Sequence, residues 1–265
     1  MFLFIAYYGL IINRINIPFD KGANDIGSKD APKTLKPYFN YLNIDKDYIV
    51  NTNNFVTNIL NEGYKFVEES FINDKFPLII GGDHTVAVSS VSAANQYSRL
   101  NNKKLGVLWC DAHADFNTIE SSPSKNLHGM PIAILCGHTL PNLQIVEELY
   151  PQQFAYFGLR DVDSIELIRL QEHNMVTLDC EKDIDEWIEY QDNIHLSFDI
   201  DCLDPSVTKC VNTPVENGKS LEEVITLFKK VKKSNKLISV DLVEYNDKKG
   251  NDHKTIAELM KYLFI

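Results

Sequence analysis

The chain is organised around residues 105–128, which read LGVLWCDAHADFNTIESSPSKNLH. The first six residues, 105–110, form a short apolar run with the length and bulk of a buried parallel strand. Asp111, His113 and Asp115 follow this run, two residues apart. In extended backbone such residues point to one side, so we expect three metal-capable side chains to converge at the end of the strand. The alternative is a polar loop of turn-forming residues.

Length and composition place the chain among ordinary globular proteins. Its 265 residues are 44% hydrophobic and 24% charged, which is enough to bury a substantial core in one large α/β domain or two small ones. The formal net charge of -11 argues against a nucleic-acid-binding protein, which usually carries a basic patch. Bound divalent cations would offset part of this acidic excess.

Neither the cysteines nor the N-terminus indicates export. The five cysteines form no C-x-x-C pair, and their odd number suits free thiols in a reducing compartment. For Cys110 and Cys202, which stand next to acidic residues, we expect buried packing rather than a nucleophilic role. Residues 1–12 are apolar, but they lack a basic start and a cleavage site and are too few to span a bilayer. We therefore expect a cytoplasmic protein that does not bind membranes, with residues 1–12 packed against the first core strand or joined to it.

Apolar runs and helical spacing alternate along the chain. Strands are predicted at residues 11–17, 76–80, 105–110, 154–158, 176–178, 194–198 and 237–243. Helices are predicted at residues 54–71, 86–96, 165–173, 184–190, 220–233 and 255–264, with a loop at 18–32. This alternation predicts an α/β fold whose parallel sheet has helices on both faces. Because the chain has no repeat, low-complexity tract or linker, we expect residues 1–265 to form a single domain.

Metal-capable side chains gather at the carboxyl ends of the predicted strands. They are His84, Asp111, His113, Asp115, Asp199, Asp201 and Glu244. Open parallel sheets place their ligand sites at this edge. Without Glu244, two imidazoles and four carboxylates are too many for one zinc ion and suit a pair of harder divalent ions such as manganese. Without cations, so many acids at one edge would carry a heavy electrostatic cost.

Three motifs resemble the metal-binding motifs of the ureohydrolase family. They are Gly81-Gly82-Asp83-His84, Asp111-Ala112-His113-Ala114-Asp115 and Ser197-Phe198-Asp199-Ile200-Asp201-Cys202-Leu203-Asp204-Pro205. Together they are highly specific, and the resemblance extends from about Pro18 to the last predicted helix. Within the family the chain looks more like the arginases than the agmatinases. The resemblance implies a three-layer α/β/α sandwich with a mostly parallel central sheet, and two Mn²⁺ ions per chain.

The resemblance also implies which residues hold the ions. One ion would be held by His84, Asp111, Asp115 and Asp199, and the other by His113, Asp111, Asp199 and Asp201. Asp111 and Asp199 would bridge the two ions. A hydroxide between the ions would attack the guanidinium carbon of the substrate, and the tetrahedral intermediate would collapse to urea and an amine.

Further residues match catalytic positions of the family. Glu244, at the end of the last predicted strand, matches the acid that binds the guanidinium group. His128 matches the histidine that shuttles protons to the leaving amine, a task suited to a group with a pKa near neutral pH. Asp115 is expected to serve catalysis as well as metal binding. The alternatives are an exposed loop glutamate at position 244 and a packed or hydrogen-bonded histidine at position 128.

The loop after the second motif distinguishes between substrates. Asn117, Ser124 and Asn126 match the polar residues with which arginases hold the α-carboxylate of L-arginine. Agmatinases, whose substrate has no α-carboxylate, look different in this loop. The resemblance therefore favours hydrolysis of L-arginine to L-ornithine and urea. A solvated loop of turn-forming residues is the alternative reading of the same polar set.

Other parts of the substrate pocket match less closely. Asp163 matches the acid that meets the α-amino group, and Glu166 follows at the spacing of a water-mediated contact. Thr213 is expected to contact the substrate, although the family usually has glycines in the surrounding segment Val211–Gly218. Asparagines in that segment tolerate left-handed backbone, so the turn can survive there. Asp247 stands where the family usually has proline.

Two other functions are consistent with the same motifs. A ureohydrolase could act on another guanidino or formimino substrate, such as agmatine or formiminoglutamate, although Asn117, Ser124 and Asp163 argue against agmatine. A catalytically silent metal-binding homologue usually lacks a metal ligand, whereas all six matched ligands are present here. We therefore expect a small-molecule substrate, L-arginine, and by resemblance a homo-oligomer, either a trimer or a hexamer.

Overall fold

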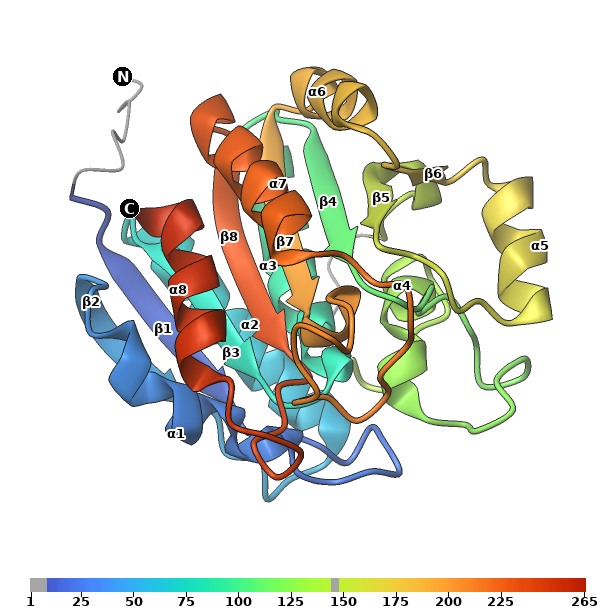
Figure 1. Cartoon of the computed structure of the whole chain (residues 1–265), viewed down its shortest axis with the longest axis horizontal. Coiled ribbons are helices and arrows are strands. Elements are labelled where there is room, and N and C mark those ends of the chain that lie inside the picture. The colour runs from blue at the N-terminus through green and yellow to red at the C-terminus, as the bar shows by residue number, and fades with distance from the viewer. Residues whose placement is uncertain (1–8, 144–147) are drawn as a thin grey trace.

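One sheet of eight strands forms the centre of the fold, and its strand order is β2-β1-β3-β8-β7-β4-β5-β6 (Figure 1). The computed structural model describes residues 9–143 and 148–265. The strands are β1 (Ile12–Ile17), β2 (Ile44–Ile49), β3 (Phe76–Gly81), β4 (Leu105–Cys110), β5 (Phe154–Phe157), β6 (Val176–Thr177), β7 (Asn193–Asp199) and β8 (Leu237–Val243). Every pairing between these strands is parallel, so their carboxyl ends lie at one edge of the sheet.

Helices cover both faces of the sheet and give three layers (Figure 1). One face is covered by α1 (Ala31–Leu35), α6 (Glu181–Tyr190), α7 (Leu221–Ser234) and α8 (His253–Phe264). The other face is covered by α2 (Val56–Ile72), α3 (Ala87–Leu100), α4 (Pro131–Leu135) and α5 (Ser164–Glu172). Short 3₁₀ turns lie between them: η1 (Ser28–Asp30), η2 (Lys36–Phe39), η3 (His84–Val86), η4 (Leu127–Gly129), η5 (Pro151–Gln153) and η6 (Ile200–Cys202). The predicted three-layer α/β/α fold is confirmed.

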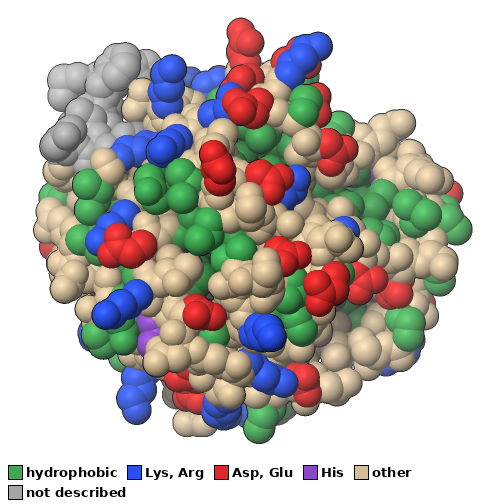
Figure 2. Space-filling view, viewed as in Figure 1, with side chains coloured by type: hydrophobic (Ala, Val, Ile, Leu, Met, Phe, Trp, Pro, Cys, Tyr) green, Lys and Arg blue, Asp and Glu red, His purple; other side chains and the backbone are tan. Residues whose placement is uncertain are grey.

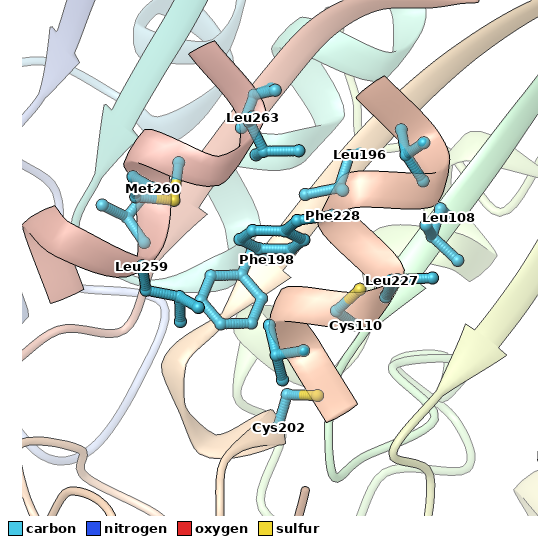
Figure 3. Close-up of a cluster of buried hydrophobic side chains, with 14 of the residues drawn as sticks. Leu108, Cys110, Leu196, Phe198, Cys202, Leu227, Phe228, Leu259, Met260 and Leu263 are labelled. Atoms are coloured by element: carbon cyan, nitrogen blue, oxygen red, sulfur yellow. The ribbon is translucent and has the colours of Figure 1, made fainter. Parts of the chain in front are cut away.

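Alternation along the strands divides the core between the two faces. In β4, Leu108 and Cys110 belong to the cluster that packs under α7 and α8, whereas Trp109 belongs to the cluster under α2 and α3. Figure 3 shows the first cluster, in which Phe198 of β7 meets Phe228 of α7 edge-on with ring centroids 5.2 Å apart. Because both faces are covered by helices, the central strands read as continuous apolar runs.

Cys110 and Cys202 pack in this core, as the sequence predicted (Figure 3). All five cysteines are free thiols. Burial raises the pKa of the Cys202 thiol well above its ordinary value, so this residue has no thiolate character at neutral pH. Both cysteines therefore act as small apolar residues in the packing between the sheet and α7.

Strand β2 and the short helices α1 and α4 were not predicted from the sequence. Strand β2 reads IDKDYI and lies at the edge of the sheet, so its three central charged residues are exposed and give no apolar run. Helix α4 has five residues, all buried, which is too short to show helical spacing. The predicted loop at 18–32 contains η1 and the first residues of α1. The remaining predicted strands and helices are confirmed with boundary shifts of a few residues, and residues 1–8 lie outside the described part.

The described α-helices pack on the two faces of the sheet. None of them is both long enough and apolar enough to cross a bilayer. Helix α7 begins at its predicted cap, where the side chain of Ser220 accepts a hydrogen bond from the backbone N–H of Glu223. The side chain of Glu223 accepts in turn from the Ser220 N–H, which completes a capping box.

The four central strands bring predicted site residues to one place. Strands β3, β8, β7 and β4 are neighbours in that order. His84 follows β3 by three residues, Glu244 follows β8, Asp199 ends β7 and Asp111 follows β4. Because the strands are parallel, these four residues share the carboxyl edge of the sheet, where α/β folds bind ligands.

At Gly82 the backbones of three segments approach one another closely at this edge of the sheet. The carbonyl of Gly82 accepts from the Glu244 N–H at 2.7 Å, and its own N–H donates to the Ile17 carbonyl at 3.0 Å. A Cβ at this position would lie 1.9 Å from the backbone oxygen of Phe19. We expect Gly82→Ala to lower the free energy of unfolding, measured by urea denaturation, by about 3 kcal/mol, since the backbone must move to admit the methyl group.

Gly129→Ala is the matched control. No atom lies within 4 Å of the position that its Cβ would take, so the change should alter the free energy of unfolding by no more than about 0.5 kcal/mol. Equal losses in the two variants would contradict the close backbone approach at Gly82.

Candidate active site

One imidazole nitrogen lies among three buried carboxylates. Nδ1 of His84 is 2.9 Å from Asp111 Oδ2, 3.1 Å from Asp115 Oδ2 and 3.3 Å from Asp199 Oδ2. Neither this nitrogen nor Asp115 Oδ2 has a hydrogen-bond partner, although both are buried. Buried polar atoms are nearly always hydrogen-bonded, so unpaired ligand atoms this close together are suited to holding a cation.

A second group of ligand atoms adjoins the first. Nδ1 of His113 lies 3.4 Å from Asp111 Oδ1 and 3.1 Å from Asp201 Oδ2. Two sets of ligand atoms, each with all members within 4.8 Å of one another, are His84, Asp111 and Asp199, and Asp111, His113 and Asp201. Asp111 is common to both sets and offers one oxygen to each. The residues present therefore fit a pair of divalent cations that share a carboxylate.

Local hydrogen bonds hold these ligands in place. Asp111 accepts from the His113 N–H at 2.7 Å and from Nε1 of Trp109 at 3.0 Å. His84 stacks on the Trp109 ring with centroids 4.1 Å apart, and its Nε2 lies 2.9 Å from Ser197 Oγ. When Nε2 carries the proton and donates it to Ser197, Nδ1 keeps a free lone pair that faces the carboxylates.

The backbone at Asp115 differs from the prediction. An extended segment was expected through Asp111, His113 and Asp115, but Asp115 has φ of 50°, in the left-handed region. This turn directs Asp115 toward His84, whereas His113 faces Asp201. Glu244 also has a left-handed backbone, with φ of 60°. Left-handed residues other than glycine are uncommon, and such strain is concentrated at functional sites.

The crowding of acids shifts their pKa values. Burial, with the neighbouring Asp111 charge, raises the pKa of Asp115 to about 6, and burial with the Asp201 and Asp111 charges raises that of Asp199 well above its usual range. Burial alone would lower the pKa of His113, but Asp111 and Asp201 outweigh it and raise that pKa to about 12. The site therefore binds positive charge strongly, whether protons or metal cations.

His128 and Glu244 form a pair beside the metal-capable groups. Nδ1 of His128 lies 3.1 Å from Glu244 Oε1, and the same oxygen accepts from the His84 N–H at 2.9 Å. Glu244 is 2% exposed and its Oε2 has no hydrogen-bond partner, so the alternative of an exposed loop glutamate is wrong. Burial lowers the pKa of His128, but the contact with Glu244 outweighs it and raises that pKa to about 9.

A pocket opens above these groups. It is lined by His84, His113, Asp115, Asn117, Ser122, Ser124, His128, Gly129, Asp161, Asp163, Glu166, Asp199, Asp201 and Thr213. Of the predicted site residues, Asp111, Asn126 and Glu244 are not among the lining residues. Glu244 contacts the lining residue His128, and the N–H of Asn126 donates to Ser124 Oγ at 3.2 Å. Ser122, Gly129 and Asp161 line the pocket although the sequence analysis did not select them. Asp161 could have been found from its alternation with Asp163 at the end of β5.

The polar end of the pocket combines an amide and acids. Nδ2 of Asn117 donates to Asp163 Oδ2 at 2.9 Å. Glu166 accepts from the Phe116 N–H at 2.8 Å and from the Asp163 N–H at 3.1 Å, and burial raises its pKa to about 7. Thr213 donates from Oγ1 to Asp201 Oδ2 at 3.0 Å, so it connects the pocket wall to a metal-capable carboxylate.

Arg160 holds the segment that departs from the family pattern, and the sequence analysis missed it. Its Nη2 donates to the carbonyls of Asp201 at 2.6 Å and Val215 at 2.8 Å. Asn217 has φ of 62°, so the expected left-handed asparagine occurs there. Asp247, in the place of the usual proline, accepts from Thr34 Oγ1 at 2.7 Å and so ties its loop to α1.

Comparisons with known proteins agree with this geometry. The sequence profile described as "Arginase family" matches residues 14–264. An arginase of Staphylococcus aureus (strain MRSA252) is 35% identical over 260 residues, covering 91% of this chain and 82% of the relative. An arginase of Bacillus subtilis (strain 168) is 35% identical over 218 residues, covering 75% and 71%.

Solved structures show the same fold. The crystal structure of Entamoeba histolytica arginase in complex with L-ornithine has a TM-score of 0.88 at 26% identity, covering 96% of this chain and 98% of that one. A formimidoylglutamase from Bacillus subtilis shares the fold alone, with a TM-score of 0.80 at 17% identity and coverage of 96% and 86%.

The raised pKa values predict how stability depends on pH without metal. A carboxyl whose pKa is raised on folding, such as Asp115 at about 6, stabilises the fold while protonated and loses that effect as pH rises through its folded value. His113 and His128, raised from 6.5 to about 12 and about 9, contribute stability below 6.5 that is lost as pH rises through the folded values. We therefore expect the Tm of EDTA-treated protein to fall steadily from about pH 5 to about pH 9.

A bound divalent cation should oppose this fall of the Tm with rising pH. Because metal binding requires deprotonated ligands, added Mn²⁺ should raise the Tm more at pH 8 than at pH 5. Both effects are read from thermal unfolding curves at matched ionic strength. A Tm of the metal-free protein that is flat or rises over this range would contradict the electrostatic description of the site.

Proposed function

Because the chain belongs to the arginase family, we propose that it hydrolyses the guanidinium group of L-arginine to L-ornithine and urea. The observation that carries this proposal is the pair of His–carboxylate groups joined by Asp111, with the His128–Glu244 pair beside them and a pocket above. A guanidinium carbon is a poor electrophile, so its hydrolysis needs a strong nucleophile held in place, a bound cation and a proton donor.

We propose that two Mn²⁺ ions bind to the residues that the motifs indicate. Asp111 and Asp199 would be shared, with His84 and Asp115 completing one set and His113 and Asp201 the other. The unpaired Nδ1 of His84 and Oδ2 of Asp115 support this arrangement. When bound, a pair of divalent ions supplies a strong nucleophile at neutral pH by lowering the pKa of water.

Glu244 and His128 would bind and protonate the substrate. Glu244 has an unpaired, buried Oε2, which suits a charge-assisted hydrogen bond to a guanidinium N–H. The other oxygen of Glu244, Oε1, binds Nδ1 of His128, so Nε2 of the ring would be free to contact the substrate. Since Glu244 raises the pKa of His128 to about 9, the ring carries a proton at neutral pH and can donate it from Nε2 to the departing amine.

The amide–acid pair would select the amino-acid end of the substrate. L-arginine carries an α-carboxylate and an α-ammonium on one carbon, and Asn117 and Asp163 present a neutral amide and an anion side by side. We propose that Asn117 and Ser124 hold the α-carboxylate and that Asp163 holds the α-ammonium. Asn126 would support Ser124 through its N–H rather than touch the substrate. Agmatine, which has no α-carboxylate, would leave these polar groups unpaired.

The proposal predicts substrate selectivity. Manganese-loaded protein should release urea from L-arginine at a kcat/KM at least about 100-fold above that for agmatine, because buried polar groups left unpaired are costly. D-arginine should also be poor, since it exchanges the positions of its two α-substituents. Urea from agmatine alone would overturn the roles given to Asn117, Ser124 and Asp163. Urea from neither, with metal bound, would overturn the proposed function.

One variant and its control test the role of Asp163 in the same assay. Asp163→Asn removes the charge that meets the α-ammonium, so the KM for L-arginine should rise about tenfold with little change in kcat. Glu172→Gln changes an exposed side chain on α5, the helix that follows Asp163, and lies outside the pocket lining, so it is the control and should change KM less than about twofold. The single domain over residues 1–265, the homo-oligomer and the cytoplasmic location stay predictions from the sequence.

A further inference from the structure

Two buried asparagines meet beside the pocket. Nδ2 of Asn246 donates to Oδ1 of Asn212 at 2.6 Å. Both side chains are buried, and Asn246 is completely inaccessible to solvent. The two residues are 34 positions apart in the chain. We refer to Asn212 and Asn246 as the asparagine pair.

The asparagine pair also binds a third segment. Nδ2 of Asn212 donates to the Asp25 carbonyl at 3.2 Å, and Nδ2 of Asn246 lies 3.4 Å from the Ile26 carbonyl. The backbone N–H of Asn246 donates to the Cys210 carbonyl at 2.7 Å. The pair therefore joins three loops that are remote in sequence: residues 20–27, 210–217 and 244–247.

Each of these loops contacts or contains part of the pocket. Thr213 follows Asn212 directly, and Glu244 precedes Asn246 by two residues. The loop 20–27 reaches His128, because the carbonyl of Gly22 accepts from the His128 N–H at 3.2 Å. One buried amide contact thus lies at the junction of the three segments that place Thr213, Glu244 and His128.

Gly27 shows how closely the first loop packs on the pair. It has φ of 139°, in the region that favours glycine. A Cβ at this position would lie 2.5 Å from both Nδ2 and Oδ1 of Asn246. Its N–H donates to Asp20 Oδ2 at 2.8 Å, which closes the loop on itself. The loop is therefore shaped to fit over Asn246 rather than lying against it loosely.

We propose that Asn212, through Asn246, is a positioning residue that fixes Thr213, Glu244 and His128 relative to one another. This inference rests on the proposed function for its catalytic consequence. Removing one partner of a buried amide pair leaves the other unsatisfied, so the loops must rearrange or admit water. A displacement of about 1 Å at catalytic groups can cost about a hundredfold in rate, so even a small rearrangement is measurable.

The first test measures the loops without any substrate. In Asn212→Ala, amide hydrogen exchange should quicken by about tenfold in all three loops, 20–27, 210–217 and 244–247. Glu216→Gln changes an exposed side chain on the same segment and leaves the Arg160 contact to its carbonyl intact, so it is the matched control and should not alter exchange. Faster exchange confined to residues 210–217 would overturn the proposal.

The second test separates positioning from stability. At a temperature well below the Tm of each variant and with equal bound manganese, Asn212→Ala should lower kcat/KM for L-arginine by about tenfold. A purely structural role would lower the Tm and leave the kcat/KM of the folded protein unchanged, and that result would overturn the proposal. The double variant with Asn246→Ala should lose no more than Asn246→Ala alone, because the two amides act as a unit.

The proposal can still be tested if Asn212→Ala does not fold or if the wild-type protein is inactive on L-arginine. If Asn212→Ala does not fold, Asn212→Ser, which is too short to reach Asn246, should give the same changes in exchange and kcat/KM. If the wild-type protein releases no urea from L-arginine, the proposed function fails, and the exchange pattern alone decides whether the pair joins the three loops.

Discussion

Four carboxylates are buried together at one edge of the sheet, and this concentration of negative charge is the constraint on which the site depends. Asp111, Asp115, Asp199 and Asp201 are each at most 5% exposed. In a medium of low dielectric such charges repel one another unless cations lie among them. His84 and His113 are interleaved with them, and the unpaired Nδ1 of His84 faces three of the four acids. Bound cations would relieve this repulsion, which is why we propose a metal site here.

The parallel sheet explains why these acids can be assembled at all. Strands β3, β8, β7 and β4 are adjacent although they come from distant parts of the chain, so a residue after each strand reaches the same edge. Helices on both faces bury the strands and exclude water from beneath the site (Figure 1). The face of the molecule seen in Figure 2 carries acidic and basic side chains interspersed, unlike the buried cluster of four carboxylates.

The central strands and the edge that carries the site could be predicted from the sequence because short local patterns encode them. Apolar runs marked the central strands, and the acids that follow them marked the site edge. What the sequence could not give depends on contacts between remote residues or on backbone shape. The pairing of His128 with Glu244 spans 116 residues, and Arg160 binds backbone carbonyls that carry no residue-specific signal. The left-handed turn at Asp115 and the position of Asn126 outside the pocket lining likewise have no local pattern, and the edge strand β2 lacks an apolar run.

We propose that the clustered acids and imidazoles hold two divalent ions. The most direct measurement is the metal content of manganese-dialysed protein after desalting, determined by mass spectrometry for the wild type and Asp111→Asn. Two ions per chain in the wild type, with loss of both in the variant because Asp111 is common to both ligand sets, is the result expected. One tightly held ion per chain, or two that survive the loss of the Asp111 charge, would contradict the shared-carboxylate site.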